Sequence, residues 1–304
     1  MHGSHDHAHH HANDFGRAFA IGIALNVTFV AVEAIYGGIA HSLALLADAG
    51  HNLSDVLGLV LAWGATVLVR RLPTRRRTYG LRKTSIMASL INALLLLIAI
   101  LVIAWEAFRR LQHPEPVSSG LVMGVAAVGI VINGVTAWLF MSGRKDDMNI
   151  RGAFLHMVAD AVVSAGVVVA ALAMRMTGWL WLDPLVSLAI VIVIGWSTWG
   201  LLRDSVNLAL DAVPQQIDPA QIEAYLAGLP GVMAVHDLHI WGVSTTEAAL
   251  TVHLVKPDAT IDDALLGRIN SDLHRRFGID HVTVQFELGD DAHPCNKARV
   301  ALAS

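Results

Sequence analysis

The chain has 304 residues, 55% of them hydrophobic and 15% charged, with a formal net charge of −4 at pH 7. A soluble domain carries about 25% charged residues, so this composition favours a membrane protein with several spans. The small net charge provides no extended basic surface, and we expect no nucleic-acid partner. Because Cys295 is the single cysteine, an intrachain disulfide is excluded.

The N-terminal tail, residues 1–16, contains six histidines in an irregular pattern. It lacks the basic and apolar regions of a signal peptide. Histidine-rich tracts bind metal, and the irregular spacing argues against the alternative, an expression tag. We predict a His-rich cytosolic tail that captures metal ions weakly.

Six apolar segments are long enough to cross a bilayer, which requires roughly 20 residues. They lie at residues 17–38, 43–69, 85–108, 118–141, 151–175 and 179–202. We predict a six-helix transmembrane bundle (all-α) over residues 17–210, in an inner membrane. Lys and Arg residues number 12 on the side that holds the loops after the second and fourth segments, and three on the other side. By the positive-inside rule, both termini lie in the cytoplasm.

Two of these segments carry the same motif, His-x-x-x-Asp, as His51 with Asp55 and as His156 with Asp160. This spacing places both side chains of a pair on one helix face. Ionisable groups inside a membrane are costly and mark functional sites. Two imidazoles and two carboxylates form a tetrahedral ligand set suited to Zn²⁺; the alternative is hydrogen bonding between helices. By helical rise the two histidines would differ in depth within the membrane by roughly 10 Å. The sequence does not show how they could then bind the same ion.

Three further acidic residues occur in or beside the spans. Asp48 lies two helical turns before Asp55, roughly 10 Å away, so we expect it to be a charge in an outer vestibule and not a ligand. Glu33 either lines the ion path or makes contacts between helices. Asp183 precedes Pro184, which predicts an N-cap followed by Pro at the first helical position.

Hydropathy falls after residue 210, and residues 211–289 are typical of a small cytosolic α+β domain. A helix with Pro at its start, two alternating strands, an amphipathic helix and a third strand follow one another, in the order α-β-β-α-β. We expect both helices to pack on one face of a three-stranded sheet. Residues 290–304 are predicted to form a flexible tail.

The polar face of this sheet contains a second candidate metal site. Strand alternation places His281 and Glu287 on one face of their strand and His253 on the polar face of the middle strand. His236 is less clear, because it shares its face with apolar residues. The alternative is a polar surface that only contacts solvent.

Three stretches together resemble the cation diffusion facilitator family of zinc transporters: SLALLADAGHNLSD at 42–55, HMVAD at 156–160 and VHDLHIW at 235–241. The resemblance covers nearly the whole chain and is strongest to bacterial exporters of zinc, cadmium and cobalt. It implies a ferredoxin-like cytosolic domain, a homodimer, and exchange of Zn²⁺ for H⁺.

The resemblance also implies roles for particular residues. The two His-x-x-x-Asp pairs match the ligands of the transported ion. Zinc would bind the cytosolic domain at positions matching His236, His253 and Glu287, whereas His281 has no secure match. Lys83 and Asp211 match positions that form a salt bridge at the membrane surface in some relatives.

We therefore predict a membrane antiporter, not an enzyme, that exports Zn²⁺ and to a lesser extent Cd²⁺ or Co²⁺. Metal binding requires deprotonated ligands and so releases protons, which couples efflux to proton entry. An intramembrane metal-dependent hydrolase would require a general base, and the sequence contains no His-Glu-x-x-His. A membrane metal sensor without flux is the alternative function.

Overall fold

The computed structural model describes residues 10–69, 73–141, 148–258 and 263–289. Most of the expected His-rich tail, residues 1–9, and the whole expected C-terminal tail, residues 290–304, lie outside this described part. The chain divides into two compact units, residues 1–60 with 92–199, and residues 61–91 with 200–304.

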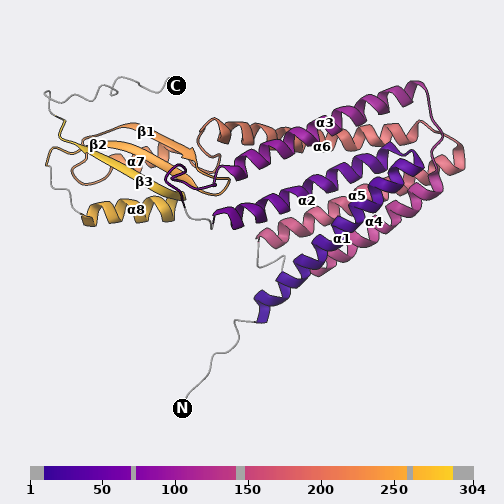
Figure 1. Ribbon diagram of the computed structural model, residues 1–304, viewed down its shortest axis with the longest axis horizontal. Helices are drawn as coiled ribbons and strands as arrows, with labels where there is room; N and C mark the ends of the chain where they lie inside the picture. Colours follow the sequence, from indigo (N-terminus) through magenta and orange to yellow (C-terminus); the bar gives the residue numbers. More distant parts are fainter. Residues whose placement is uncertain (1–9, 70–72, 142–147, 259–262, 290–304) are drawn as a thin grey trace, which may run out of the picture. The chain divides into compact units, whose positions relative to one another are not determined.

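Six long helices come first, and Figure 1 labels them in chain order. Their bounds are α1 His10–Ala40, α2 Leu43–Val69, α3 Thr84–Gln112, α4 Ser119–Phe140, α5 Met148–Thr177 and α6 Leu182–Ala209. Among the described residues, four helices are long and apolar enough to cross a membrane: α3, α4, α6 and the Phe154–Thr177 part of α5. Ala24–Ala40 of α1 is a shorter apolar helix.

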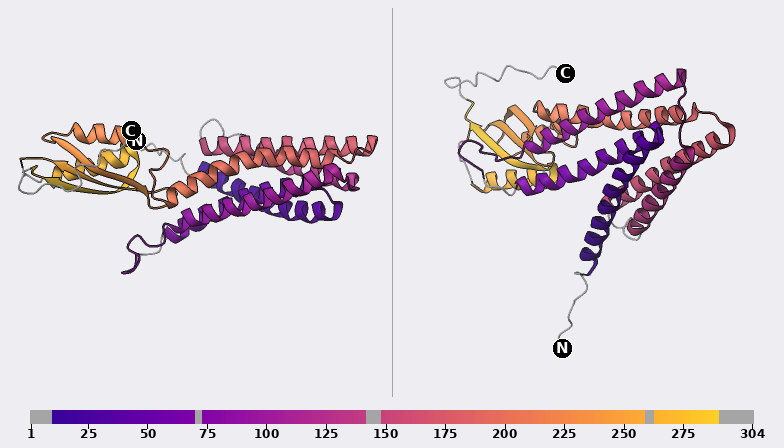
Figure 2. Two further views of the ribbon diagram at one scale, coloured as in Figure 1. Left: turned by 90° about the horizontal axis from the view of Figure 1, so that it is seen from above. Right: turned by 45° about the vertical axis from the view of Figure 1, so that its right-hand side comes forward.

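In the first unit, α4 packs along α5 and against α1. Figure 2 shows α4, in magenta, and α5, in pink, side by side. Gly129 of α4 permits the close approach. A Cβ at this position would lie 2.6 Å from the Phe29 ring of α1 and 3.0 Å from the Ser164 hydroxyl of α5. Small residues allow membrane helices to approach closely, so Gly129 sets the spacing of the helices that carry part of the site described below.

Asp183 caps a different helix from the one predicted. Helix α6 already begins at Leu182, so Asp183 lies inside its first turn. The Asp183 carboxylate accepts hydrogen bonds from the Ser42 hydroxyl at 2.5 Å and the Leu43 backbone N–H at 2.8 Å. The first N–H groups of a helix lack partners within the helix, and Asp183 satisfies one of them at the start of α2. The prediction that Asp183 caps its own helix, α6, was therefore wrong, because it caps α2.

The C-terminal domain follows in the predicted order, with α7 Pro219–Ala227, β1 Ala234–Gly242, β2 Ala248–Val255, α8 Asp263–Phe277 and β3 Ile279–Glu287. The sheet order is β1-β2-β3, with β1 antiparallel and β3 parallel to β2; Figure 2 shows the orange and yellow strands side by side. One apolar core joins the sheet to both helices. Its fully buried members include Ile222, Leu226, Leu250, Leu254, Ile269 and Leu273.

Strand β1 is interrupted by a bulge. Its pairing with β2 shifts register between His236 and His239, and Asp237 has a φ of 51°. An extra residue in one strand bends it and changes which face the side chains occupy. The bulge brings His236 to the same side as His253, its partner across the strands.

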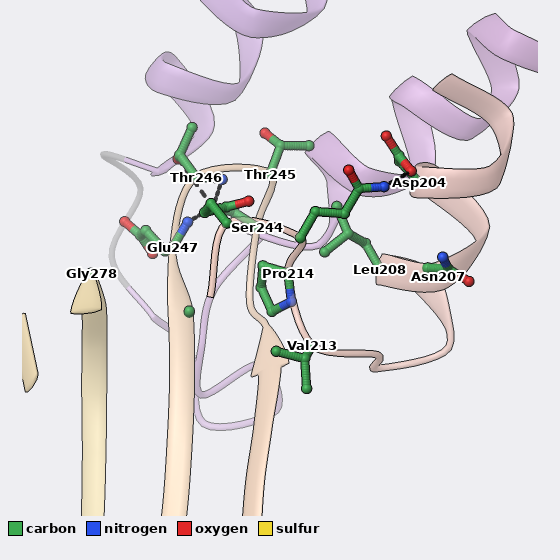
Figure 3. A pocket seen from close by; sticks show the side chains of 13 residues that line it. Asp204, Asn207, Leu208, Val213, Pro214, Ser244, Thr245, Thr246, Glu247 and Gly278 are labelled. Carbon is green, nitrogen blue, oxygen red and sulfur yellow. Dashed lines mark hydrogen bonds between the residues drawn. The ribbon is translucent and has the colours of Figure 1, made fainter. Parts of the chain in front are cut away.

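The β1–β2 hairpin contacts the start of α3 within the second unit. The Arg82 guanidinium lies 2.5 Å from Glu247, and the Thr245 N–H donates to the Ser85 hydroxyl at 3.2 Å. The expected pair Lys83–Asp211 is present at 2.6 Å. A cavity of about 190 Å³ lies between the end of α6, residues 213–216 and the hairpin, and Figure 3 shows Asp204 and Glu247 on its opposite sides.

Candidate metal centres

Three of the predicted membrane ligands meet in the first unit, and we call them the helix cluster: His51, His156 and Asp160. Each offers a ligand atom within 4.8 Å of the others. The Asp160 carboxylate lies 3.5 Å from His51 Nε2 and 3.6 Å from His156 Nε2, and the two imidazole rings meet edge to face at 5.8 Å. The fourth predicted ligand, Asp55, follows His51 by one turn of α2, but its side chain lies outside the described residues.

The donor set of the helix cluster suits a cation. Asp160 is 2% exposed, and its Oδ2 accepts no hydrogen bond from the described residues. A buried carboxylate without donors is costly unless it is paired or coordinates a metal. Neutral imidazoles and a carboxylate together are typical ligands of Zn²⁺. The cluster can therefore hold a divalent cation inside a helical bundle.

Asp48 and Glu33 form a second polar group in the same unit. Both are fully buried, so the expected exposed vestibule charge at Asp48 was wrong. Asn52 donates to Glu33 Oε2 at 3.2 Å, and Ser164 donates to Asp48 Oδ2 at 3.4 Å. The other oxygen of each carboxyl group, Glu33 Oε1 and Asp48 Oδ1, has no hydrogen-bond partner among the described residues. Of the two roles expected for Glu33, the structure favours contacts between helices over lining an exposed ion path.

The C-terminal domain holds the second group, which we call the sheet cluster: His236, His253 and Glu287. Glu287 Oε1 lies 2.8 Å from His253 Nδ1, and Oε2 lies 3.0 Å from His236 Nε2. The rings of the two histidines are 5.2 Å apart. Asp237, the residue of the bulge, lies 3.5 Å from His253 Nε2 and could supply an oxygen atom as a fourth ligand.

Comparison with known proteins decides the family. The model for the cation efflux transmembrane domain matches residues 19–208, and the model for the cation efflux protein, cytoplasmic domain, matches residues 214–288. The chain belongs to the cation efflux, or cation diffusion facilitator, family. It is therefore a multi-pass membrane protein of a transporter family.

Curated relatives match this cation efflux protein over nearly its whole length. The metal cation efflux system protein CzcD of Cupriavidus metallidurans is 36% identical and covers 97% of this chain and 92% of the relative. The zinc transporter ZitB of Escherichia coli is 36% identical with 95% of both chains covered. The cadmium, cobalt and zinc/H(+)-K(+) antiporter of Bacillus subtilis is 36% identical with 85% of both covered.

One solved structure also matches this cation efflux protein. It is the metal-bound C-terminal domain of the CzcD transporter from Cupriavidus metallidurans, at 41% identity. The match covers 24% of this chain and 100% of that chain, with a TM-score of 0.22.

The structure separates His281 from the sheet cluster with which it was predicted. Its Nε2 lies 2.6 Å from Arg82 and 4.0 Å from Glu247, and its ring packs against Tyr79 at 5.5 Å. In the parallel ladder His281 is opposite Ala249, whereas Glu287 is opposite Val255. Strand alternation puts both on one face but six residues apart, about 20 Å along the strand.

Sequence reasoning missed Asp237 as a neighbour of the sheet cluster. Regular alternation would place it on the face opposite His236, and the bulge that changes this has no certain signal in the sequence. A partial signal existed, because Asp is among the few residues that adopt positive φ. The two histidines of VHDLHIW also receive different surroundings: His236 joins the cluster, and His239 is exposed beside Asp237 at 3.0 Å.

Proposed function

We propose that this chain exports Zn²⁺ from the cytoplasm in exchange for protons, with Cd²⁺ and Co²⁺ as further substrates. The observation that carries the proposal is the helix cluster, a buried carboxylate with two imidazoles within 4.8 Å. The names of the relatives, a zinc transporter and a cadmium, cobalt and zinc antiporter, support the substrate class.

The proposed architecture has six transmembrane helices over residues 17–210, between a His-rich tail at 1–16 and a ferredoxin-like domain at 211–289 with a flexible tail at 290–304. The protein lies in the bacterial inner membrane with both termini in the cytoplasm. The distribution of Lys and Arg supports this orientation. The observed α-β-β-α-β order supports the ferredoxin-like topology.

The transport site consists of His51, Asp55, His156 and Asp160. With neutral histidines and ionised carboxylates the site carries a charge of −2, which Zn²⁺ neutralises. Taking an empty, charged site through a low-dielectric barrier is costly, and protons on the same ligands reduce that cost. Because ligands must be deprotonated to bind metal, Zn²⁺ and H⁺ compete, and this competition couples their opposite movements.

The membrane potential bounds the stoichiometry. At about 100 mV, moving two positive charges outward costs about 4.6 kcal/mol, and one entering proton returns about 2.3 kcal/mol. Exchange of one proton for one zinc ion therefore requires a pH gradient or a low external zinc concentration.

In the C-terminal domain we propose that His236, His253 and Glu287 bind a regulatory Zn²⁺ that stabilises a homodimer. An ion that binds only the dimer shifts the association equilibrium towards it. His281, which the sequence predicted as a further ligand, is not part of the proposed site because it lies about 20 Å from Glu287 along β3.

Zinc uptake into proteoliposomes after an imposed pH step tests the transport function. We expect uptake that requires the pH step and is accompanied by proton movement in the opposite direction. A hydrolase or a metal sensor would bind zinc without such flux, so the absence of uptake by folded, zinc-binding protein would contradict the proposal.

Competition between ions has a separate test. Histidine titrates near pH 6.5, so apparent zinc affinity should weaken as cytosolic pH falls from about 7 to 6. Purified protein titrated with Zn²⁺ in weak buffer should release protons. Tight binding without proton release would leave transport possible but exclude this coupling device.

A further inference from the structure

A basic hollow lies beside the start of α3, in the second unit. It has a volume of about 540 Å³, and its lining combines the segment between α2 and α3, the first turn of α3 and the end of β1. Its basic side chains are Arg76, Arg77 and Lys83, and no Asp or Glu lines it. Neither the helix cluster nor the sheet cluster contributes a residue to it.

The charges in this hollow are unequal in what they contact. Lys83 is neutralised by Asp211 at 2.6 Å. Arg76 and Arg77 are exposed, and neither forms an ion pair with any residue in the described part of the chain. Guanidinium groups present forked donors that match phosphate oxygens. Two unpaired guanidinium groups around one concavity therefore favour a phosphate ligand.

The remaining lining is typical of a membrane boundary. Tyr79 is 45% exposed, and Met87, which belongs to the first turn of the apolar helix α3, is 40% exposed. Trp241 of β1 completes the aromatic part of the wall. Tyrosine and tryptophan concentrate where a bilayer meets water. A ligand in this hollow thus meets cationic groups on one side and an apolar helix surface on another.

We propose that this hollow binds the phosphate group of an anionic phospholipid. The arginines receive the phosphate, and Tyr79 and Met87 contact the glycerol and the upper acyl chains. Basic concavities at the ends of membrane helices bind anionic headgroups in this way. A free phosphate ion has the same charge chemistry but would leave the apolar wall without a partner.

The position of the hollow adds a structural consequence. Arg82, between the lining residues Leu81 and Lys83, bonds Glu247 of the hairpin, and Trp241 in the wall belongs to the strand that carries His236. A bound headgroup therefore contacts both the α2–α3 segment and the sheet. Lipid at this site would hold the two together.

The test uses full-length protein in neutral detergent, titrated separately with short-chain phosphatidylglycerol, short-chain phosphatidylcholine and inorganic phosphate. Melting temperature is followed in wild type, in Arg76→Gln with Arg77→Gln, and in Arg75→Gln. Arg75 is the matched control, since it is exposed, adjacent and absent from the lining. Arg76→Lys with Arg77→Lys is a further variant that keeps the positive charges but removes the forked donor geometry of the guanidinium groups.

We expect phosphatidylglycerol, and not phosphatidylcholine, to raise the melting temperature of wild type. The midpoint concentration should rise at least about tenfold in the double glutamine variant, less in the double lysine variant, and remain unchanged in Arg75→Gln. If Arg75→Gln raised the midpoint as much as the double glutamine variant, general charge attraction would explain the result and the proposal would be overturned. Equal stabilisation by inorganic phosphate at the same concentrations would overturn the lipid assignment, as would an unchanged midpoint in the double glutamine variant.

Discussion

The helix cluster and the sheet cluster contain the same donor types, two imidazoles and a carboxylate, in different states of satisfaction. In the helix cluster the carboxylate lies 3.5 and 3.6 Å from the imidazole nitrogens, beyond the usual range for a hydrogen bond. In the sheet cluster the corresponding distances are 2.8 and 3.0 Å. The Glu287 carboxylate thus has partners without an ion, although His236 Nδ1 has none among the described residues, whereas the helix cluster leaves the buried Asp160 Oδ2 without a hydrogen bond. This contrast fits a transport site in one case and an optional, regulatory site in the other.

The largest effect is expected from Asp160→Ala, which removes the buried carboxylate shared by both histidines. Zinc flux in proteoliposomes should fall to the background of protein-free vesicles, while the protein stays folded. Glu287→Ala should reduce flux much less. Comparable loss in the two variants would break the distinction between a transport site and a regulatory one.

His51→Asp should change selectivity before it abolishes function. Imidazole suits Zn²⁺ at about 2.0–2.1 Å, and we expect a carboxylate in its place to leave the helix cluster more tolerant of a larger ion. We expect the ratio of Cd²⁺ to Zn²⁺ transport to rise by about tenfold, measured by competition in the same vesicles. An unchanged ratio would remove His51 from the residues that determine selectivity.

A smaller effect is expected when the sheet cluster is removed by His253→Ala with Glu287→Ala. Zinc should raise the dimer fraction and melting temperature of an Asp160→Ala background, in which the proposed transport site is disabled, and these shifts should vanish in the combined variant. His281→Ala is the matched control, because the structure places it beside Arg82. If the His281 variant lost the zinc response as well, the separation of His281 from the cluster would be wrong.

Asp237 permits the backbone of the bulge to be tested apart from its carboxylate. Asn also tolerates positive φ, so Asp237→Asn should keep the melting temperature and weaken zinc binding by the sheet cluster. Asp237→Ala should in addition lose about 1 kcal/mol of stability, because Ala lacks the short polar side chain that lets Asp and Asn adopt the left-handed conformation. Equal zinc affinity in wild type and the Asn variant would assign Asp237 a backbone role alone.

The smallest effect lies outside both clusters, where α7 meets α8. Tyr225 donates to Asp272 at 2.9 Å, which lowers the pKa of Asp272; burial, and then this hydrogen bond, raises the pKa of Tyr225. The Asp272 contribution is present above the unfolded pKa and is lost as pH falls through the lowered one. The Tyr225 contribution is present below the unfolded pKa and is lost as pH rises through the raised one.

Tyr225→Phe should therefore lower the melting temperature by a few degrees at neutral pH and flatten its decline on the acid side. Melting curves over a pH series measure both, with Asp272→Asn as the partner variant. A steeper decline of the melting temperature at acid pH in the Phe variant would contradict the predicted link between Asp272 protonation and stability. Neither variant should alter zinc binding by the sheet cluster.

The helices and the His156–Asp160 pair could be predicted because both follow from periods within one helix. The depth relation between α2 and α5 could not, since it depends on how two helices slide along each other. The sequence left His51 and His156 roughly 10 Å apart in depth, yet their rings meet at 5.8 Å. Helix α5 begins at Met148, earlier than the expected residue 151, which moves the apparent inner end of the span.

The sheet cluster was harder to predict than the helix cluster. Alternation correctly separated the apolar and polar faces of β2 and β3, but it gives a face and not a distance along it. That is why alternation grouped His281 with Glu287 on one face. His236 required the reverse correction, since local geometry at Asp237 and not the period of the strand brings it to His253.

The bond of Asp183 to Ser42 and Leu43 has a consequence for motion. A transporter must expose its site alternately to two sides, so its helices have to tilt against one another. Pulling the start of α2 away from α6 would leave a buried carboxylate without donors, at a cost of several kcal/mol. We therefore expect this end of α2 to move least when the helices tilt. His51 lies about 12 Å along α2 from it, so a tilt about this end would displace the ligand less than it displaces the opposite end of the helix.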